Sequence, residues 1–235
     1  SISHVPPLLI ALYDNGGSSS SFIWAFAITL FTGFFLWLPV HHARAELRVR
    51  DGYLITALFW IVLGSFGAIP FMLSPSPNMG VVESLFEAFS GLSTTGATVL
   101  TGIDQLPRSI LYYRQQPLKD NKLSPRIADT AKTLWLIYCA LTLLCALAYW
   151  AAGMNLFDAI GHSFSTIAIG GFSTHDASIG YFDSALIELI CMFFMAISGM
   201  NFALHFLALR SRSLTAYLKD PECQTYLKIL AAAFL

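Results

Sequence analysis

Two stretches of this sequence decide its fold: VVESLFEAFSGLSTTGATVL at residues 81–100 and LFDAIGHSFSTIAIGGFSTH at residues 156–175. A shift of 75 residues aligns them without a gap and places Glu83 on Asp158 and Gly96 on Gly171. The same shift matches three further pairs: Phe89 with Phe164, Ser90 with Ser165, and Thr98 with Ser173. Each copy joins a short apolar segment to a loop rich in Gly, Thr and Ser. Such self-similarity indicates an architecture built from copies of one unit.

The composition around these stretches is that of a membrane protein. Of 235 residues, 56% are hydrophobic and only 11% are charged, and the mean hydropathy is +0.64. Soluble domains carry about 25% charged residues, so a water-soluble domain and a disordered chain are both excluded. The net charge of −1 gives no reason to expect nucleic acid as a partner. No Lys or Arg precedes Arg44 and there is no initiator Met, so we expect no signal peptide and a start inside a longer protein.

Four stretches approach the roughly 20 apolar residues that a spanning helix needs. They are residues 22–40, 54–73, 133–152 and 185–209, and residues 2–13 and 226–235 are shorter candidates. Basic residues are absent from the four stretches. They gather instead at Arg44, Arg48 and Arg50, at Lys119, Lys122, Arg126 and Lys132, and at Arg210, Arg212, Lys219 and Lys228. Because short basic loops face the cytoplasm, residues 41–52, 118–132 and 210–224 are predicted to lie inside.

With this topology, the chain has one membrane crossing fewer than the positions of its basic loops require. The helix at 54–73 runs outward, yet the next basic cluster must again lie inside, and residues 74–118 hold no full span. Residues 81–92 would form only about 18 Å of helix against a core of about 30 Å. We therefore predict that a spanning segment is absent near Gln115–Gln116. The predicted unit is helix, half-helix, Gly/Thr-rich loop, helix, and the first copy lacks its closing helix.

The half-helices and their loops suit a cation. Glu83 and Asp158 are expected in the first helical turn, where they complement the positive N-terminal end. The negative C-terminal ends then point into Thr94–Thr95–Gly96 and Ile169–Gly170–Gly171. Irregular backbone at membrane depth persists only where protein buries it or it lines an aqueous path, and carbonyl rings can replace the hydration shell of an alkali ion. With no carboxylate inside the loops, a monovalent cation is favoured over a divalent one.

Three segments carry a resemblance to a known family: FEAFSGLSTTGATVLTG (86–102), KDNKLSPRIADTAKTLW (119–135) and FDAIGHSFSTIAIGGFSTHDASIGYFDS (157–184). Over essentially its whole length the chain resembles the TrkH family, membrane subunits of bacterial Trk potassium-uptake systems within the Trk/Ktr/HKT superfamily. The resemblance implies an all-α polytopic membrane protein with tandem parallel helix–pore-loop–helix repeats around a pseudo-fourfold pore, incomplete in this chain. The implied parts are two preceding helices (1–50), repeat one without its second helix (51–117), repeat two (118–212) and the start of repeat three (213–235).

The resemblance also implies which residues meet the ion. The selectivity filter would comprise Thr94, Thr95, Gly96, Ala97 and Thr98 in loop one and Ile169, Gly170, Gly171, Phe172 and Ser173 in loop two. Carbonyls of Thr94, Thr95, Ile169 and Gly170 would coordinate K⁺, the transported ion, and Glu83 and Asp158 would cap the pore helices. The implied setting is a homodimer of full-length subunits in the bacterial inner membrane, with TrkA as cytosolic nucleotide-binding regulatory subunit. No organic cofactor and no enzymatic activity are implied.

Several alternatives stay open from the residues alone. A secondary cation-coupled carrier also uses broken helices, and a membrane-embedded enzyme would need a convergent acid, base and nucleophile, which the sequence around His162 does not offer. His162 itself is interpreted as a packed or capped histidine. Ser198 to Asn201 interrupt the last long apolar stretch, which predicts either a bend or a pore-lining position. Asp176 and Asp183 could enrich cations at the mouth or simply occupy turns.

Overall fold

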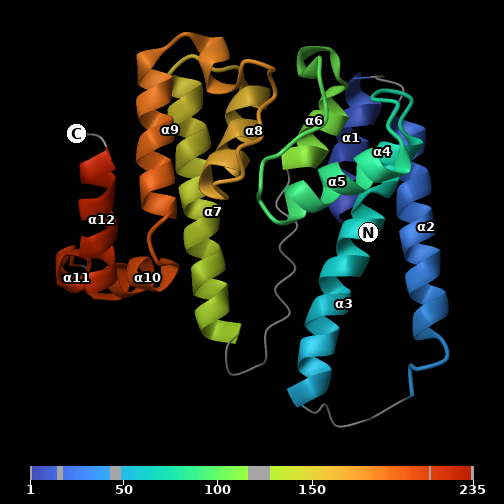
Figure 1. Cartoon of the computed structure of the whole chain (residues 1–235), viewed down its shortest axis with the longest axis horizontal. Helices are drawn as coiled ribbons and strands as arrows, with labels where there is room; N and C mark the ends of the chain where they lie inside the picture. Colours follow the sequence, from blue (N-terminus) through green and yellow to red (C-terminus); the bar gives the residue numbers. More distant parts are fainter. Residues whose placement is uncertain (1, 15–17, 43–48, 116–127, 212, 234–235) are drawn as a thin grey trace. The chain divides into compact units, whose positions relative to one another are not determined.

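The computed structural model describes residues 2–14, 18–42, 49–115, 128–211 and 213–233 (Figure 1). Every regular element in these ranges is a helix. Outside the described residues lie several basic residues of the predicted inside loops, Arg44, Arg48, Lys119, Lys122, Arg126 and Arg212, as well as positions 116–117, where a span is predicted to be absent. The chain forms two compact units, residues 1–118 together with 170–178, and residues 119–169 together with 179–235.

The first unit contains six α-helices among its described residues. They are α1 (Val5–Asp14), α2 (Ser19–Trp37), α3 (Val49–Gly67), α4 (Ile69–Leu73), α5 (Val81–Leu92) and α6 (Arg108–Gln115), with short 3₁₀ turns at Ile2–His4 and Ile103–Gln105. α1 packs on α2 and α6, and α5 packs on α3, α4 and α6. The short α5 lies across the end of α3 rather than along it (Figure 1). The neighbouring helices of the same unit therefore bury one face of α5, with Ser84, Glu87, Ala88 and Ser90.

Aromatic packing and a long-range hydrogen bond help to hold this unit together. Tyr113 on α6 lies against Phe22 and Phe71, with ring centroids 5.6 Å and 5.4 Å apart. Its hydroxyl donates to the carbonyl of Gly67 over 2.9 Å. Gly67 is the last residue of α3 and lies three residues before Pro70 of α4. This hydrogen bond therefore links α6 to the end of α3.

The second unit contains the other helices of the described chain. They are α7 (Ala128–Ala151), α8 (Leu156–Ile167), α9 (Ala185–Ser198), α10 (Phe202–Ser211), α11 (Thr215–Lys219) and α12 (Pro221–Ala233), and a 3₁₀ turn spans Ser178–Phe182. α8 packs against α7 and α9, and Figure 1 shows it beside α7. Their shared core includes Cys145, Tyr149, Ile167, Ile187 and Phe194. The Tyr149 hydroxyl pairs with that of Thr166 at 2.8 Å, so the polar end of α8 is bonded within the core.

Three of the four predicted spans are confirmed by the length and apolarity of single helical segments. The matching segments are Ser19–Trp37, Asp51–Leu73 and Lys132–Ala151, and only 17%, 28% and 22% of their residues, respectively, are buried inside the protein. Apolar helices that expose so much of their surface are expected to meet lipid.

The fourth predicted span, residues 185–209, corresponds to two helices separated by a bend. α9 and α10 form a pair bent by 88° at a break of a few residues, so the bend predicted at Ser198–Asn201 is what the structure shows. Side chains take over the bonding of the backbone there. The Tyr226 hydroxyl donates to the carbonyl of Ala196 over 3.1 Å, and the His205 ring bonds the carbonyl of Ile197 over 3.1 Å. The two side chains thus bond carbonyl groups near the end of α9. The sequence pattern alone did not indicate these partners.

Candidate functional site

The two predicted half-helices are α5 and α8, and each is 12 residues long with the bounds expected from the sequence. A helix of this length rises about 18 Å, roughly half of a hydrocarbon core. Both begin with an acidic first turn. The Glu83 carboxylate accepts from the backbone N–H of Gly80 over 2.9 Å, and Asn155 accepts from the N–H of Asp158 over 2.9 Å while its amide donates to that carboxylate. The start of each half-helix is thus capped and negatively charged.

The loops that follow the half-helices share an unusual backbone conformation. Thr94 has φ +54° and Gly96 has φ +75°; in the second copy Ile169 has φ +52° and Gly171 has φ +71°. Positive φ is uncommon for residues other than glycine, and such strain clusters at functional sites. The two copies therefore share one pattern of left-handed residues at every second position, in the same 75-residue register as the sequence repeat.

Within the first unit, loop one touches the segment of loop two that begins at Gly170. A Cβ atom built on Gly96 would collide with the carbonyl oxygen of Gly170 and would lie 3.1 Å from the Cα of Gly171. Position 96 therefore requires glycine for two reasons. Its φ is positive, and the nearby Gly170 carbonyl leaves no room for a Cβ atom. The structure thus brings Gly96, Gly170 and Gly171 together through their main chains. Of the other predicted filter residues, Thr95, Ala97, Thr98 and Ile169 are exposed, Thr94 is half-buried, and Phe172 and Ser173 are buried.

A second link between the loops lies just beyond them. Asp176 accepts from the backbone N–H of Ile103 over 3.0 Å, and Asp104 accepts from the N–H of Asp176 over 3.3 Å and pairs with the ring Nδ1 of His175. The hydrogen bond from His175 and that from the Asp176 backbone lower the pKa of Asp104 below its ordinary 3.8. Asp176 therefore ties the two loop exits together, which favours its interpretation as a turn residue.

His162 and the polar residues near it form no catalytic arrangement. His162 is buried, its Nδ1 bonds the carbonyl of Asp158 over 3.0 Å, and its ring lies edge-on to Phe182. This is the packed histidine that the sequence predicted.

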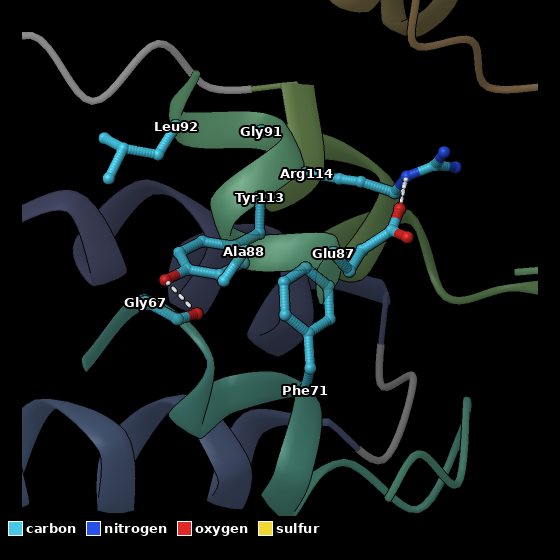
Figure 2. Close-up of a pocket in the computed structure, with 8 residues that line it drawn as sticks. All are labelled: Gly67, Phe71, Glu87, Ala88, Gly91, Leu92, Tyr113 and Arg114. Carbon is cyan, nitrogen blue, oxygen red and sulfur yellow. Dashed lines mark hydrogen bonds and ion pairs between the residues drawn. The ribbon is translucent and has the colours of Figure 1, made fainter. Parts of the chain in front are cut away.

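Sequence reasoning missed two charged residues beside the loops, Glu87 and Arg114. They form a buried ion pair with Nε and Oε1 2.8 Å apart, shown in Figure 2. The available signal was a carboxylate in the middle of an apolar half-helix, at the position where the second copy carries His162. Charged residues within membrane segments mark function by default, and this one was overlooked because it lies before the loop rather than in it.

Comparison with known proteins identifies the family. The family model for TrkH, described as a cation transport protein, matches residues 18–117 and 114–231. The chain belongs to the TrkH family. It is 53% identical to the Trk system potassium uptake protein TrkH of Halomonas elongata, over 100% of this chain and 56% of that protein. It is 50% identical to the protein of the same name in Escherichia coli K12, over 95% of this chain and 53% of that protein.

A solved TrkH-family structure has the same fold. The crystal structure of the potassium transporter TrkH from Vibrio parahaemolyticus matches with a TM-score of 0.92 and 47% identity, and the match covers 98% of this chain and 54% of that one. The chain thus spans about half the length of the curated relatives that it matches. As a member of this family it is a multi-pass membrane protein of a transporter family rather than of an enzyme family.

The comparison with TrkH relatives also bears on the missing crossing. The alignment with the Halomonas elongata protein extends over 269 positions, whereas this chain has 235 residues, so 34 positions have no counterpart here. The two matches of the family model meet at residues 114–117. Together these positions amount to one span of about 20 residues with its connections.

The 3₁₀ turn and the helix after loop one align with elements of the second copy. With the shift of 75, the 3₁₀ turn at Ile103–Gln105 corresponds to residues 178–180, and α6 corresponds to residues 183–190, where α9 begins. In this sequence register α6 aligns with the first turns of α9.

Proposed function

We propose that this chain forms two of the filter loops of a potassium-uptake pore and that backbone carbonyl oxygens select the ion. The observation that carries the proposal is the pair of loops with matching left-handed residues, Thr94 with Ile169 and Gly96 with Gly171, each at the end of a capped half-helix. The relatives are Trk system potassium uptake proteins by name, which supports potassium as the ion.

The chemistry follows from the main chain. The C-terminal end of each half-helix carries a partial negative charge, and the loop that follows offers carbonyl oxygens but no carboxylate. Carbonyls of Thr94, Thr95, Ile169 and Gly170 replace water around a partly dehydrated K⁺. Gly96 and Gly171 let the backbone turn without a side chain in the path, and Ala97, Thr98, Phe172 and Ser173 complete the two loops. An open pore with no covalent step lets K⁺ move inward down its electrochemical gradient.

The repeat boundaries, the membrane location, the oligomeric state and the regulatory partner are parts of the same proposal. Residues 51–117, 118–212 and 213–235 belong to successive pore repeats after two preceding helices in 1–50, because α3–α5–α6 and α7–α8–α9 follow one element order. The complete protein would supply the remaining loops in the bacterial inner membrane. It would work as a homodimer with TrkA, a nucleotide-binding regulator, on its cytoplasmic side. The Trk system names of the relatives support a multi-component system.

The test is a chimera in which this chain replaces the matching half of the Vibrio parahaemolyticus TrkH, and in which the positions of that protein that have no counterpart here are restored after residue 115. Expressed in bacteria that lack potassium uptake, the chimera should restore growth at low potassium and take up K⁺ in preference to Na⁺. Gly96→Ser and Gly171→Ser should reduce that preference. A chimera that reaches the membrane but transports both ions equally, or in which both variants keep full preference, refutes the proposal.

A further inference from the structure

A buried ion pair connects the two loops of the first unit. Glu87 on α5 is 1% exposed and Arg114 on α6 is 5% exposed, and Figure 2 shows the two side chains reaching toward one another from their helices. Arg114 Nε lies 2.8 Å from Glu87 Oε1. Taking two charges out of water is costly, and an apolar pair of similar size is often as stable. The pair therefore calls for an explanation other than stability.

Glu87 holds loop one. The Thr98 hydroxyl lies 2.9 Å and 3.0 Å from the two carboxylate oxygens, to which it donates, and the backbone N–H of Val99 donates to Oε2 over 3.3 Å. The Thr98 oxygen in turn accepts from the N–H of Leu100 over 3.1 Å. These bonds fix the residues that follow Gly96, so the carboxylate sets the path of the chain as it leaves the narrowest part of the loop.

Arg114 holds loop two. Its guanidinium carbon lies 4.7 Å from the ring centroid of Phe172, a buried residue directly after Gly171. A planar guanidinium stacks on an aromatic face more favourably than an ammonium does, and desolvation strengthens the attraction. The edge of the same ring lies 3.7 Å from the Cβ position of Gly91 on α5. Phe172 is thus confined between the cation and α5, and its main chain positions Gly170 and Gly171.

This connection belongs to the first copy alone. The 75-residue shift carries Glu87 to His162 and Arg114 to Leu189, so the second copy has no carboxylate–guanidinium pair at these two positions. The second half-helix is instead secured by apolar packing and by the bond of His162 to its own helix. One ion pair in repeat one therefore serves a loop from each repeat.

We propose that Glu87 and Arg114 form a brace that sets the spacing between the two loops and thereby determines which cation fits. They act as positioning residues, since neither is required to touch the ion. The brace is a property of the folded chain, whereas its effect on ion choice rests on the proposed function. The two parts need separate measurements.

The first measurement is hydrogen–deuterium exchange of the purified chain in lipid nanodiscs. Arg114→Met should raise exchange in residues 97–103 and 170–176 by about tenfold, because both loops lose their support. Arg114→Lys keeps the charge but not the planar stack, so it should raise exchange in 170–176 and leave 97–103 near the wild-type rate. Tyr113→Phe is the control, since it removes a buried hydrogen bond from the neighbouring residue of α6 and touches neither loop.

Two outcomes would overturn the brace. One is unchanged exchange in 170–176 in both Arg114 variants. The other is an increase in exchange of equal size in α7 of the Arg114 variants, or in the two loops of the Tyr113→Phe control. In either case the ion pair would be a general stabilising contact.

The second measurement uses the chimera and compares uptake of K⁺ and Na⁺. Glu87→Gln and Arg114→Lys should lower the K⁺ preference by several-fold while total cation uptake persists, and Tyr113→Phe should leave the preference unchanged. An unaltered preference in both brace variants refutes the role in ion choice. A wild-type chimera that does not transport K⁺ counts against the proposed function, while the exchange experiment still decides the brace.

Discussion

Replacing Gly96 with alanine should cost more than the same change at two other glycines with nearly the same backbone conformation. Gly96, Gly171 and Gly102 have φ of +75°, +71° and +67°. A new Cβ at Gly96 would collide with the Gly170 carbonyl oxygen, at Gly171 it would lie 3.6 Å from the Cα of Gly96, and at Gly102 it would meet nothing within 4 Å. All three substitutions place a side chain on a backbone with positive φ, and Gly96→Ala adds a collision with the Gly170 carbonyl oxygen.

The expected magnitudes follow from those two contributions. A side chain in the left-handed region costs about 1–2 kcal/mol, and forcing an extra methyl into a filled space costs about 1–3 kcal/mol more. Alanine also restricts the unfolded chain, which offsets about 0.4–1 kcal/mol equally at all three sites. Gly96→Ala should therefore lower the free energy of unfolding by about 1–3 kcal/mol more than Gly171→Ala or Gly102→Ala, which should differ little from each other.

The assay is SDS titration of the purified chain in mixed micelles, with tryptophan fluorescence reporting unfolding. Gly171→Ala and Gly102→Ala serve as internal controls, because each keeps the backbone strain and avoids the collision. If Gly96→Ala falls within about 0.5 kcal/mol of Gly102→Ala, the close approach of the two loops is not a constraint and the reasoning about the filter glycine fails.

Two further predictions concern helix packing and pH. Gly64→Ala places a Cβ about 2.5 Å from the Phe89 ring and should destabilise the α3–α5 contact by about 1–3 kcal/mol, whereas Gly33→Ala, with open space around it, should stabilise α2 by about 0.5–1 kcal/mol; the same SDS titration measures both, and equal effects would contradict the packing. Because folding lowers the pKa of Asp104 below 3.8, its contribution is present above that value and disappears as pH falls through the lowered pKa. The thermal unfolding midpoint of wild type should therefore approach that of Asp104→Asn in strong acid, and a gap that stays constant from about pH 5 to about pH 2 would argue against the role of this carboxylate.

The local features of this protein could be predicted from its amino-acid sequence. The bounds of α5 and α8, their acidic first turns and the register between the two copies all depend on residues close in the chain, where composition, caps and glycines decide the outcome. Three spans followed from apolar length alone. Parity of the basic loops also indicated the missing crossing, because topology depends on charge near the spans rather than on packing.

The features that join distant residues depend on how the helices pack. The bend after Ser198 has a definite angle because Tyr226 and His205 satisfy its carbonyls, and the brace exists because Arg114 meets both Glu87 and Phe172. Periodicity and propensity describe neighbours along the chain, whereas these contacts depend on which surfaces pack together. A carboxylate in a half-helix gives no sign of its partner until the fold brings a cation within reach.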